Sequence, residues 1–209
     1  MSKWDTSNWK VTTLYYTWTN CRAMRHLNVG TWDTSEWAVT TLQNTWNNCF
    51  NLEDATFLKW DTSNWAVTTL SYSLYACHKL TEMDFTKWDT SNWALTSITY
   101  LMGYCKKLKK LDISNLDLTN VPIANYGSNK TSYTIVYECY ALESLKLPST
   151  FKGHLNLRYS YLITRTEILS IFNTLATALS DATITLTEMR YKLTNADIAI
   201  ATAKGYTVV

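Results

Sequence analysis

Five cysteines are the residues of this chain best suited to metal or redox chemistry. Four of them follow one another at intervals of 28 residues, and the full set is Cys21, Cys49, Cys77, Cys105 and Cys139. No two cysteines form a Cys-x-x-Cys pair, and an odd number cannot pair completely in disulfides. Each cysteine also shares the apolar side of its segment with leucines and valines. We therefore expect buried, reduced thiols, with a metal or redox site as the alternative.

The histidines and lysines do not add a catalytic group. His26, His78 and His154 occupy unequal positions in the chain's repeated pattern, so no nucleophile–base pair can be argued from them. We therefore predict a protein that is not an enzyme and uses no cofactor. The densest basic run is Lys106, Lys107, Lys109 and Lys110. We interpret this basic run as a solvated strand edge, and the alternative is a contact with an anion such as lipopolysaccharide.

Tyrosines provide the best candidate for binding chemistry. They lie in segments that vary among Tyr, Asn, Ser, Thr and Gly, while the flanking residues hardly change from copy to copy. These residue types are typical of antibody binding loops, where tyrosine gives a large contact area at a low entropic cost. Random drift on an exposed surface is the alternative interpretation. The predicted binding residues are Tyr15, Tyr16, Tyr72, Tyr75, Tyr100 and Tyr104.

A repeat of 28 residues must position these side chains. The motif Trp-Asp-Thr-Ser occurs once in each copy, at Trp4, Trp32, Trp60 and Trp88, and a second tryptophan follows at Trp9, Trp37, Trp65 and Trp93. A fifth, degenerate copy ends at Cys139 and carries an insertion that we place within residues 125–131. Stacked copies would bring equivalent residues into ladders. Because stacked aspartates would repel one another, we expect each one to accept hydrogen bonds from its own turn.

Two apolar patterns within each copy predict its secondary structure. Apolar residues three or four positions apart fit one face of a helix, as in Val67, Leu70, Leu74, Cys77 and Leu80. The pattern then changes to period two, with Met83 and Phe85 on either side of Asp84. Leu111 and Ile113 repeat this alternation around Asp112. Each copy is therefore predicted to contain a turn, a short helical arm and a short strand.

Two segments resemble a known repeat family. Cys105-Lys-Lys-Leu108-Lys-Lys-Leu111-Asp-Ile113 and Trp60-Asp-Thr-Ser-Asn64 are similar to the BspA-like leucine-rich repeats of bacterial surface proteins and their phage-encoded relatives. The second tryptophan of each copy lengthens the usual repeat of that family. The resemblance covers about residues 1–150 and implies an α/β leucine-rich-repeat-like solenoid, with a parallel sheet on one side and short helices on the other. It also implies roles in adhesion and host contact.

The chain divides into five repeats over residues 1–150 and capping repeats over residues 151–209. The cap is predicted to be largely helical, and Thr166 is the expected N-cap of its first helix. The expected cap elements are a strand at Leu155 and Leu157, a helix over Ile168–Leu179, a strand over Thr183–Leu186, a helix over Thr194–Lys204 and a strand over Tyr206–Val209.

Composition limits the partners and the location. The net charge is +2, which does not indicate a nucleic-acid binder, and the most apolar segment, residues 168–179, is too short to span a membrane. No secretory signal follows Met1, so we expect a virion or cell-surface protein if a signal was removed, and otherwise a cytoplasmic one. Because Lys3 already lies inside a repeat, we expect self-association or a longer parent chain at the N-terminal edge.

We therefore expect a virion-associated recognition or adhesion module, carried by a phage, that binds a protein or a cell-surface glycan. The alternatives are a fragment of a bacterial surface adhesin and a structural spacer without a ligand. The tyrosine segments also have a competitor, because repeat solenoids often bind ligands on the sheet side. Its candidate residues are His26, Asn28, Asp84, Lys110, Asp112 and Lys146.

Overall fold

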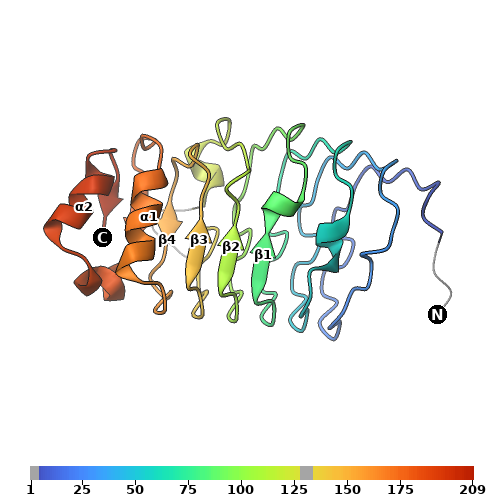
Figure 1. Cartoon of the computed structure of the whole chain (residues 1–209), viewed down its shortest axis with the longest axis horizontal. Helices are drawn as coiled ribbons and strands as arrows, with labels where there is room; N and C mark the ends of the chain where they lie inside the picture. The colour runs from blue at the N-terminus through green and yellow to red at the C-terminus, as the bar shows by residue number, and fades with distance from the viewer. Residues whose placement is uncertain (1–4, 128–133) are drawn as a thin grey trace.

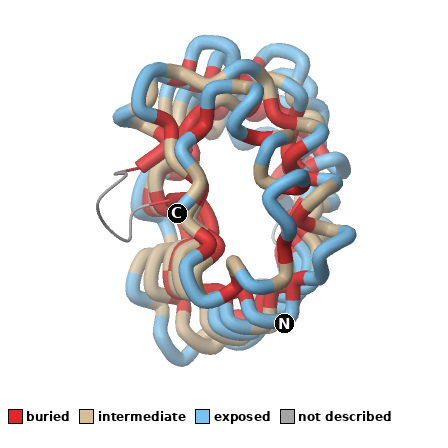
Figure 2. Tube along the Cα trace, turned by 90° about the vertical axis from the view of Figure 1, so that its left-hand side faces the viewer, coloured by how far each residue is buried: buried red, intermediate tan, exposed pale blue. Residues whose placement is uncertain are grey.

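The computed structural model describes residues 5–127 and 134–209, so Lys3, Trp4 and part of the predicted insertion lie outside the described residues. Over these described residues the fold is mixed α/β, with two small parallel sheets and two α-helices. Successive copies of the repeat form a row of coils that runs from the N-terminus to α2 (Asn195–Thr202) at the other end (Figure 1). Figure 2 looks along this row and shows the coils superposed around a common interior.

The two sheets contain three strands each. The first joins β1 (Glu82–Asp84), β2 (Lys110–Asp112) and β3 (Ser144–Lys146), and the second joins β4 (Leu155–Asn156), β5 (Thr183–Thr185) and β6 (Thr207–Val208). Asp84 pairs in register with Asp112, which pairs with Lys146. The strands predicted around Asp84 and Asp112 are therefore confirmed. Four 3-10 helices complete the described elements: η1 (Thr56–Lys59), η2 (Phe85–Lys87), η3 (Ile123–Asn125) and η4 (Thr187–Lys192).

Stacked tryptophans fill the interior of the first coils. The rings of Trp32 and Trp60 lie 6.2 Å apart and almost parallel, and those of Trp37 and Trp65 lie 6.4 Å apart. The indole N–H of Trp60 also donates to the carbonyl of Val29 in the preceding copy. These contacts confirm the predicted ladder for Trp32 and Trp60 and show a second one for Trp37 and Trp65. They tie neighbouring copies together, because each buried ring contacts the next copy as well as its own.

The aspartates after these tryptophans behave as predicted. The carboxylate of Asp33 accepts hydrogen bonds from the hydroxyl and the backbone N–H of Ser35, and these bonds lower the pKa of Asp33. Asp89 accepts from the backbone N–H of Ser91 in the same way, and its pKa is also lowered. Each carboxylate therefore keeps its charge by bonding within its own turn.

The segments predicted to be helical arms are not helices. Residues 14–21, 42–49, 70–77 and 98–105 form tight turns instead, and we call these four segments the turn ribbon. The N–H groups of Leu70 and Leu74 donate to carbonyls of the next copy, and the N–H of Ser73 closes a turn on the carbonyl of Leu70. In an α-helix the N–H of Leu74 would instead donate to the carbonyl of Leu70. The prediction of short helices opposite the sheet is therefore wrong.

Residue type explains this error. Thr, Ser, Asn, Tyr and Trp fill most of the turn ribbon, and they are weak helix formers. Leu70, Leu74 and Cys77 are still buried, so successive turns bury the same spacing of apolar residues as a helix would. Bonds between stacked copies replace the bonds within a helix.

The C-terminal elements largely follow the sequence. The strands predicted near Leu155, Thr183 and the C-terminus and both helices are present. However, α1 (Arg165–Thr174) ends before Leu175, and its N-cap is Thr164 rather than Thr166. Thr164 has extended backbone and its hydroxyl accepts the N–H of Glu167, whereas Thr166 already lies inside the helix. No helix within the described ranges is long and apolar enough to cross a membrane.

The two ends of the row differ in how their cores are covered. At the C-terminal end, Arg165 of α1 forms an ion pair of 2.7 Å with Asp197 of α2. In the first copy, Val11, Trp18 and Cys21 are only partly buried. Their equivalents in the second copy, Val39, Trp46 and Cys49, are at most 1% exposed.

Candidate functional site

The backbone of the turn ribbon places tyrosines in an unfavourable conformation. Tyr72 and Tyr100 are the third residues of turns closed on Leu70 and Ile98, and their φ angles are 57° and 55°. Tyr104 has a φ of 63°. Positive φ favours Gly or Asn and costs other residues about 1–2 kcal/mol each. Tyrosine is therefore unfavourable on this backbone, as is Ala76 at the position equivalent to Tyr104.

Four of the six predicted binding tyrosines lie together. The ring of Tyr100 is 4.7 Å from that of Tyr72 and 5.3 Å from that of Tyr75, and Tyr75 is 5.3 Å from Tyr104. Gly103 leaves room for this packing, since a Cβ there would lie 3.0 Å from the ring of Tyr100. Tyr100 is only 7% exposed, which corrects the expectation that it lies on an exposed face. It is the centre of the group, and its neighbours present the accessible surface.

The other two predicted tyrosines lie apart from this group. Tyr15 and Tyr16 pack edge to face, with ring centroids 4.4 Å apart, and they are 52% and 48% exposed. The second copy separates them from Tyr72, and it carries Asn44 and Asn48 where later copies have Tyr72 and Tyr104. Within the described structure, no ring contact joins the pair to the main group. The six predicted tyrosines therefore form two separate surfaces.

The main group continues towards the C-terminus through tyrosines that the sequence analysis missed. Ring contacts link Tyr104 to Tyr137 at 5.4 Å and Tyr137 to Tyr159 at 5.6 Å. Tyr159 then contacts Tyr140 at 5.8 Å and Tyr161 at 6.4 Å. We call the whole set the tyrosine strip, and its members are Tyr72, Tyr75, Tyr100, Tyr104, Tyr137, Tyr140, Tyr159 and Tyr161.

A signal for this continuation was present in the sequence. Tyr137 stands two residues before Cys139, as Tyr75 stands two residues before Cys77. Aligning the fifth copy on its cysteine, instead of on its altered start, would have placed Tyr137 next to the predicted residues. Tyr159 and Tyr161 lie beyond the repeats, so alignment on the repeated cysteine would not have placed them next to the predicted residues.

The competing site is a groove of about 590 Å³ beside the first sheet. Met83, Leu111 and Leu58 contribute apolar lining, and four of the competing candidates also line it: Asp84, Lys110, Asp112 and Lys146. His26 and Asn28 do not line this groove. The structure therefore brings together four of the six residues of this competing set.

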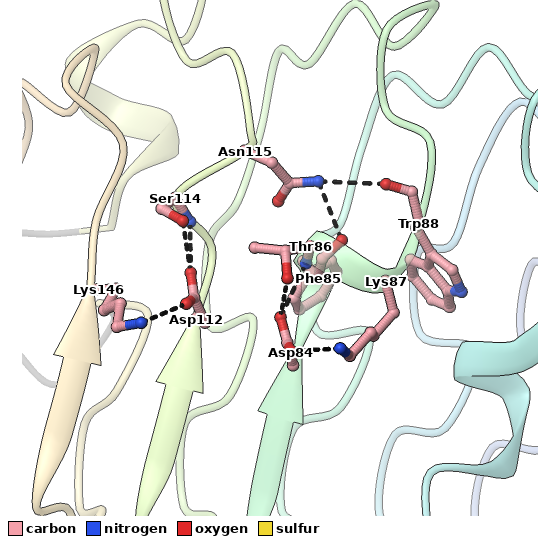
Figure 3. Close-up of polar contacts among 9 residues, drawn as sticks. All are labelled: Asp84, Phe85, Thr86, Lys87, Trp88, Asp112, Ser114, Asn115 and Lys146. Carbon is pink, nitrogen blue, oxygen red and sulfur yellow. Dashed lines mark hydrogen bonds and ion pairs between the residues drawn. The ribbon is translucent and has the colours of Figure 1, made fainter.

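Two acidic groups of the groove, Asp84 and Asp112, already have partners (Figure 3). Asp84 accepts the backbone N–H of Thr86 at 3.0 Å and lies 3.7 Å from the amine of Lys87. Asp112 accepts the N–H of Ser114 at 3.0 Å and pairs with Lys146 at 3.2 Å. These contacts satisfy backbone N–H groups in the turns that follow β1 and β2. A ligand would have to compete with them for the same oxygens.

The remaining candidates for chemistry stay dispersed. His26 pairs with Asp54, His78 stacks on Phe50, and the ring nitrogen of His154 accepts the N–H of Thr183. Lys106 and Lys107 are exposed after the turn ribbon, Lys109 directly precedes β2, and Lys110 is its first residue. Across the described ranges, no group of three His, Cys, Asp or Glu residues could hold a metal ion.

Burial of the cysteines is confirmed for all but Cys21, which is partly buried. The thiol of Cys105 donates to the carbonyl of Leu74 in the preceding copy, and Cys77 donates to Trp46 in the same way. Burial raises the pKa of Cys49 and of Cys105 to about 12. Thiols held in this state are poor nucleophiles, because the thiolate is the reactive form. The repeated cysteine therefore links copies by packing and hydrogen bonding.

A family model described as "Mycoplasma protein of unknown function, DUF285" matches residues 12–133, more than half of the chain. The matched span includes the turn ribbon up to Tyr104 and ends before Tyr137. No curated protein and no solved structure matches the chain.

Proposed function

Starting from the fact that the chain belongs to the DUF285 family, we propose that it is a non-enzymatic recognition module that binds a protein or a cell-surface glycan through the tyrosine strip. Since the family carries no assigned activity, the proposal rests on the site. The observation that carries it is tyrosine at left-handed backbone positions, above all Tyr72 and Tyr104.

Backbone strain supports a role for these side chains. The second copy has Asn44 and Asn48 at the same two positions, so the fold accepts the residue that suits this backbone. The third copy has Tyr72 and Ala76 at these positions, and the fourth has Tyr100 and Tyr104. Each of these residues has a cost of about 1–2 kcal/mol that asparagine largely avoids. Residues held in unfavourable conformations gather at functional sites. Binding offers a reason for the tyrosines that folding alone does not.

The chemistry of the strip also favours recognition. Tyrosine rings bury a large area on contact, and their hydroxyls can donate and accept hydrogen bonds. Aromatic residues dominate the residues whose truncation costs binding about 2 kcal/mol or more. By comparison, Asp84 and Asp112 in the groove already serve their own turns. We therefore prefer the strip over the groove.

The proposed architecture and setting follow the resemblance to BspA-like repeats. We propose that the row of coils is a leucine-rich-repeat-like solenoid, and that the protein acts at a virion or cell surface. A phage-borne host-binding protein is the leading setting, and a fragment of a bacterial surface adhesin is the second. A spacer without a ligand is the competing function.

Two matched double variants test the proposal. Labelled protein is applied to bacterial cells and to a glycan array, and binding is compared for Tyr72→Asn with Tyr104→Asn and for Asp84→Ala with Lys110→Ala. The tyrosine variant should bind at least ten-fold more weakly, because it removes rings but keeps residues that the second copy already uses. The groove variant should stay within two-fold of wild type. The reverse pattern would move the site to the groove, and no binding by wild-type protein would favour the spacer.

A further inference from the structure

One carboxylate lies within the tyrosine strip. Glu138 occupies the position of Tyr104 in the fifth copy, with a φ of 56°. The hydroxyl of Tyr140 donates to its carboxylate at 2.9 Å. Burial raises the pKa of Tyr75 and of Tyr104, and the negative charge of Glu138 raises both further. The carboxylate of Glu138 therefore accepts a hydrogen bond from one phenol and acts electrostatically on two others, and the three phenols come from three different copies.

The charge of Glu138 is not neutralised within the described part of the chain. No lysine, arginine or histidine there forms an ion pair with Glu138. Glu188 offers a contrast at the end of the strip. It accepts the hydroxyl of Tyr161 at 2.8 Å, but it also lies 3.8 Å from the guanidinium of Arg158. Glu138 is half-buried, and among the described residues the phenol of Tyr140 is the hydrogen-bond partner of its carboxylate.

We propose that Glu138, with Tyr75, Tyr104 and Tyr140, binds the primary ammonium group of a lysine side chain on a protein partner. This inference rests on the proposed function and deepens it. An ammonium group would form a charge-assisted hydrogen bond with the Glu138 carboxylate. The ring electrons attract the same cation, and the methylene stem of lysine packs on aromatic surface.

The geometry favours a primary over a quaternary ammonium group. Neighbouring rings meet at steep angles, 60° for Tyr75 and Tyr104 and 60° for Tyr140 and Tyr159, so they partly cover one another's faces. The site offers carboxylate and phenol oxygens instead, which accept hydrogen bonds that a quaternary group cannot donate.

A protein fits better than a phospholipid headgroup. An ethanolamine headgroup also carries a primary ammonium, but its phosphate would lie close to the unneutralised Glu138 and be repelled. The strip extends on both sides of Glu138 through several copies, and it therefore offers further contact area to a protein surface.

The first test is a titration followed by NMR, with n-butylammonium as the lysine side-chain probe. We expect saturable shifts for wild type, at least ten-fold weaker binding for Glu138→Gln, and less than two-fold change for Glu143→Gln. Glu143 is the matched control because it carries the same charge and pairs with Lys109 elsewhere on the molecule. Thermal unfolding of the variants confirms that both are folded. Absent binding, equal binding by Glu138→Gln, or equal shifts with neutral n-butanol would each overturn the inference, as would tighter binding of tetramethylammonium.

A second arm separates protein from lipid. Poly-L-lysine and phosphatidylethanolamine vesicles are each tested against wild type, Glu138→Gln and Glu143→Gln. Loss of poly-L-lysine binding in Glu138→Gln alone supports a protein partner, whereas a loss confined to vesicle binding overturns that assignment. Neither arm needs the natural partner. If both fail while the Tyr72→Asn, Tyr104→Asn variant still loses cell or glycan binding, this inference is wrong and the proposed function stands.

Discussion

The sheet side and the turn ribbon belong to the same coils, but their side chains do different work. Beside the first sheet, Asp84 and Asp112 bond the turns that follow their strands, so these side chains stabilise the local backbone. In the turn ribbon the relation is reversed. At Tyr72 and Tyr104 the backbone has an unfavourable positive φ, and this conformation positions the two tyrosine side chains. A side chain that the fold does not need is the better candidate for recognition.

The largest expected effect concerns the core that both regions share. Trp65 is 0% exposed and stacks on Trp37, so Trp65→Ala should lower the free energy of unfolding by about 3–5 kcal/mol. Trp9→Ala is the matched comparison, because this equivalent ring is 36% exposed. Its loss should be clearly smaller in chemical denaturation. Similar losses for both would show that the copies do not share one continuous core.

The next effect should appear only beside the sheet. Asp112→Ala removes acceptors for the N–H and hydroxyl of Ser114 and for the amine of Lys146. We expect the free energy of unfolding to fall by about 1 kcal/mol, as when a capping side chain is removed. Chemical denaturation measures this loss, and a binding assay on the same variant should show no change. Weakened ligand binding by Asp112→Ala would contradict the claim that the sheet side stabilises the fold while the turn ribbon binds the ligand.

Acid should act on stability through aspartates that lie outside the turn ribbon. Hydrogen bonds lower the pKa of Asp33 and Asp89, and Arg165 with Thr194 lowers the pKa of Asp197 to about 2. A lowered pKa in the folded state contributes stability above the unfolded value of 3.8, and this stability is lost as the pH falls towards 2. Thermal unfolding between pH 6 and about pH 2 should show the loss, and Asp197→Asn should reduce its slope. A flat profile would contradict the assigned bonds.

The smallest effect has the opposite sign. Tyr72→Asn relieves a residue at positive φ, so stability should stay constant or rise by up to about 1 kcal/mol. Tyr75→Asn is the control in the same ring cluster, because it loses ring contacts without relieving backbone strain. Differential scanning calorimetry should rank Tyr72→Asn above Tyr75→Asn. The opposite order would remove the strain argument for function.

Sequence patterns predicted the parts of the fold that depend on alternation and repetition. The alternation around Asp84 and Asp112 identified β1 and β2, and the repeated Trp-Asp-Thr-Ser motif identified the bonded aspartates. The helical arms failed because a spacing of three and four residues does not distinguish a helix from stacked turns. That choice depends on bonds to the next copy, such as Tyr72 to Thr99, which a single copy does not reveal.

The site was predictable only in part, for a related reason. Tyr72, Tyr75, Tyr100 and Tyr104 were identified because they interrupt a regular repeat. Tyr159 and Tyr161 join them only through the spatial order of the coils, since they lie in the C-terminal cap. Glu138 was missed because the insertion in the fifth copy hides its equivalence to Tyr104.

Chemical footprinting of tyrosines tests the central claim most directly. The protein is treated with tetranitromethane alone and in complex with the cell surface or glycan that binds it, and nitrated residues are identified by mass spectrometry. Tyr140 and Tyr161 of the strip are 37% and 44% exposed, and Tyr191, outside the strip, is 82% exposed and serves as the internal control. The tyrosine-strip account predicts protection of Tyr140 and Tyr161 with unchanged nitration of Tyr191. Unchanged nitration of both strip residues in a saturated complex would contradict it.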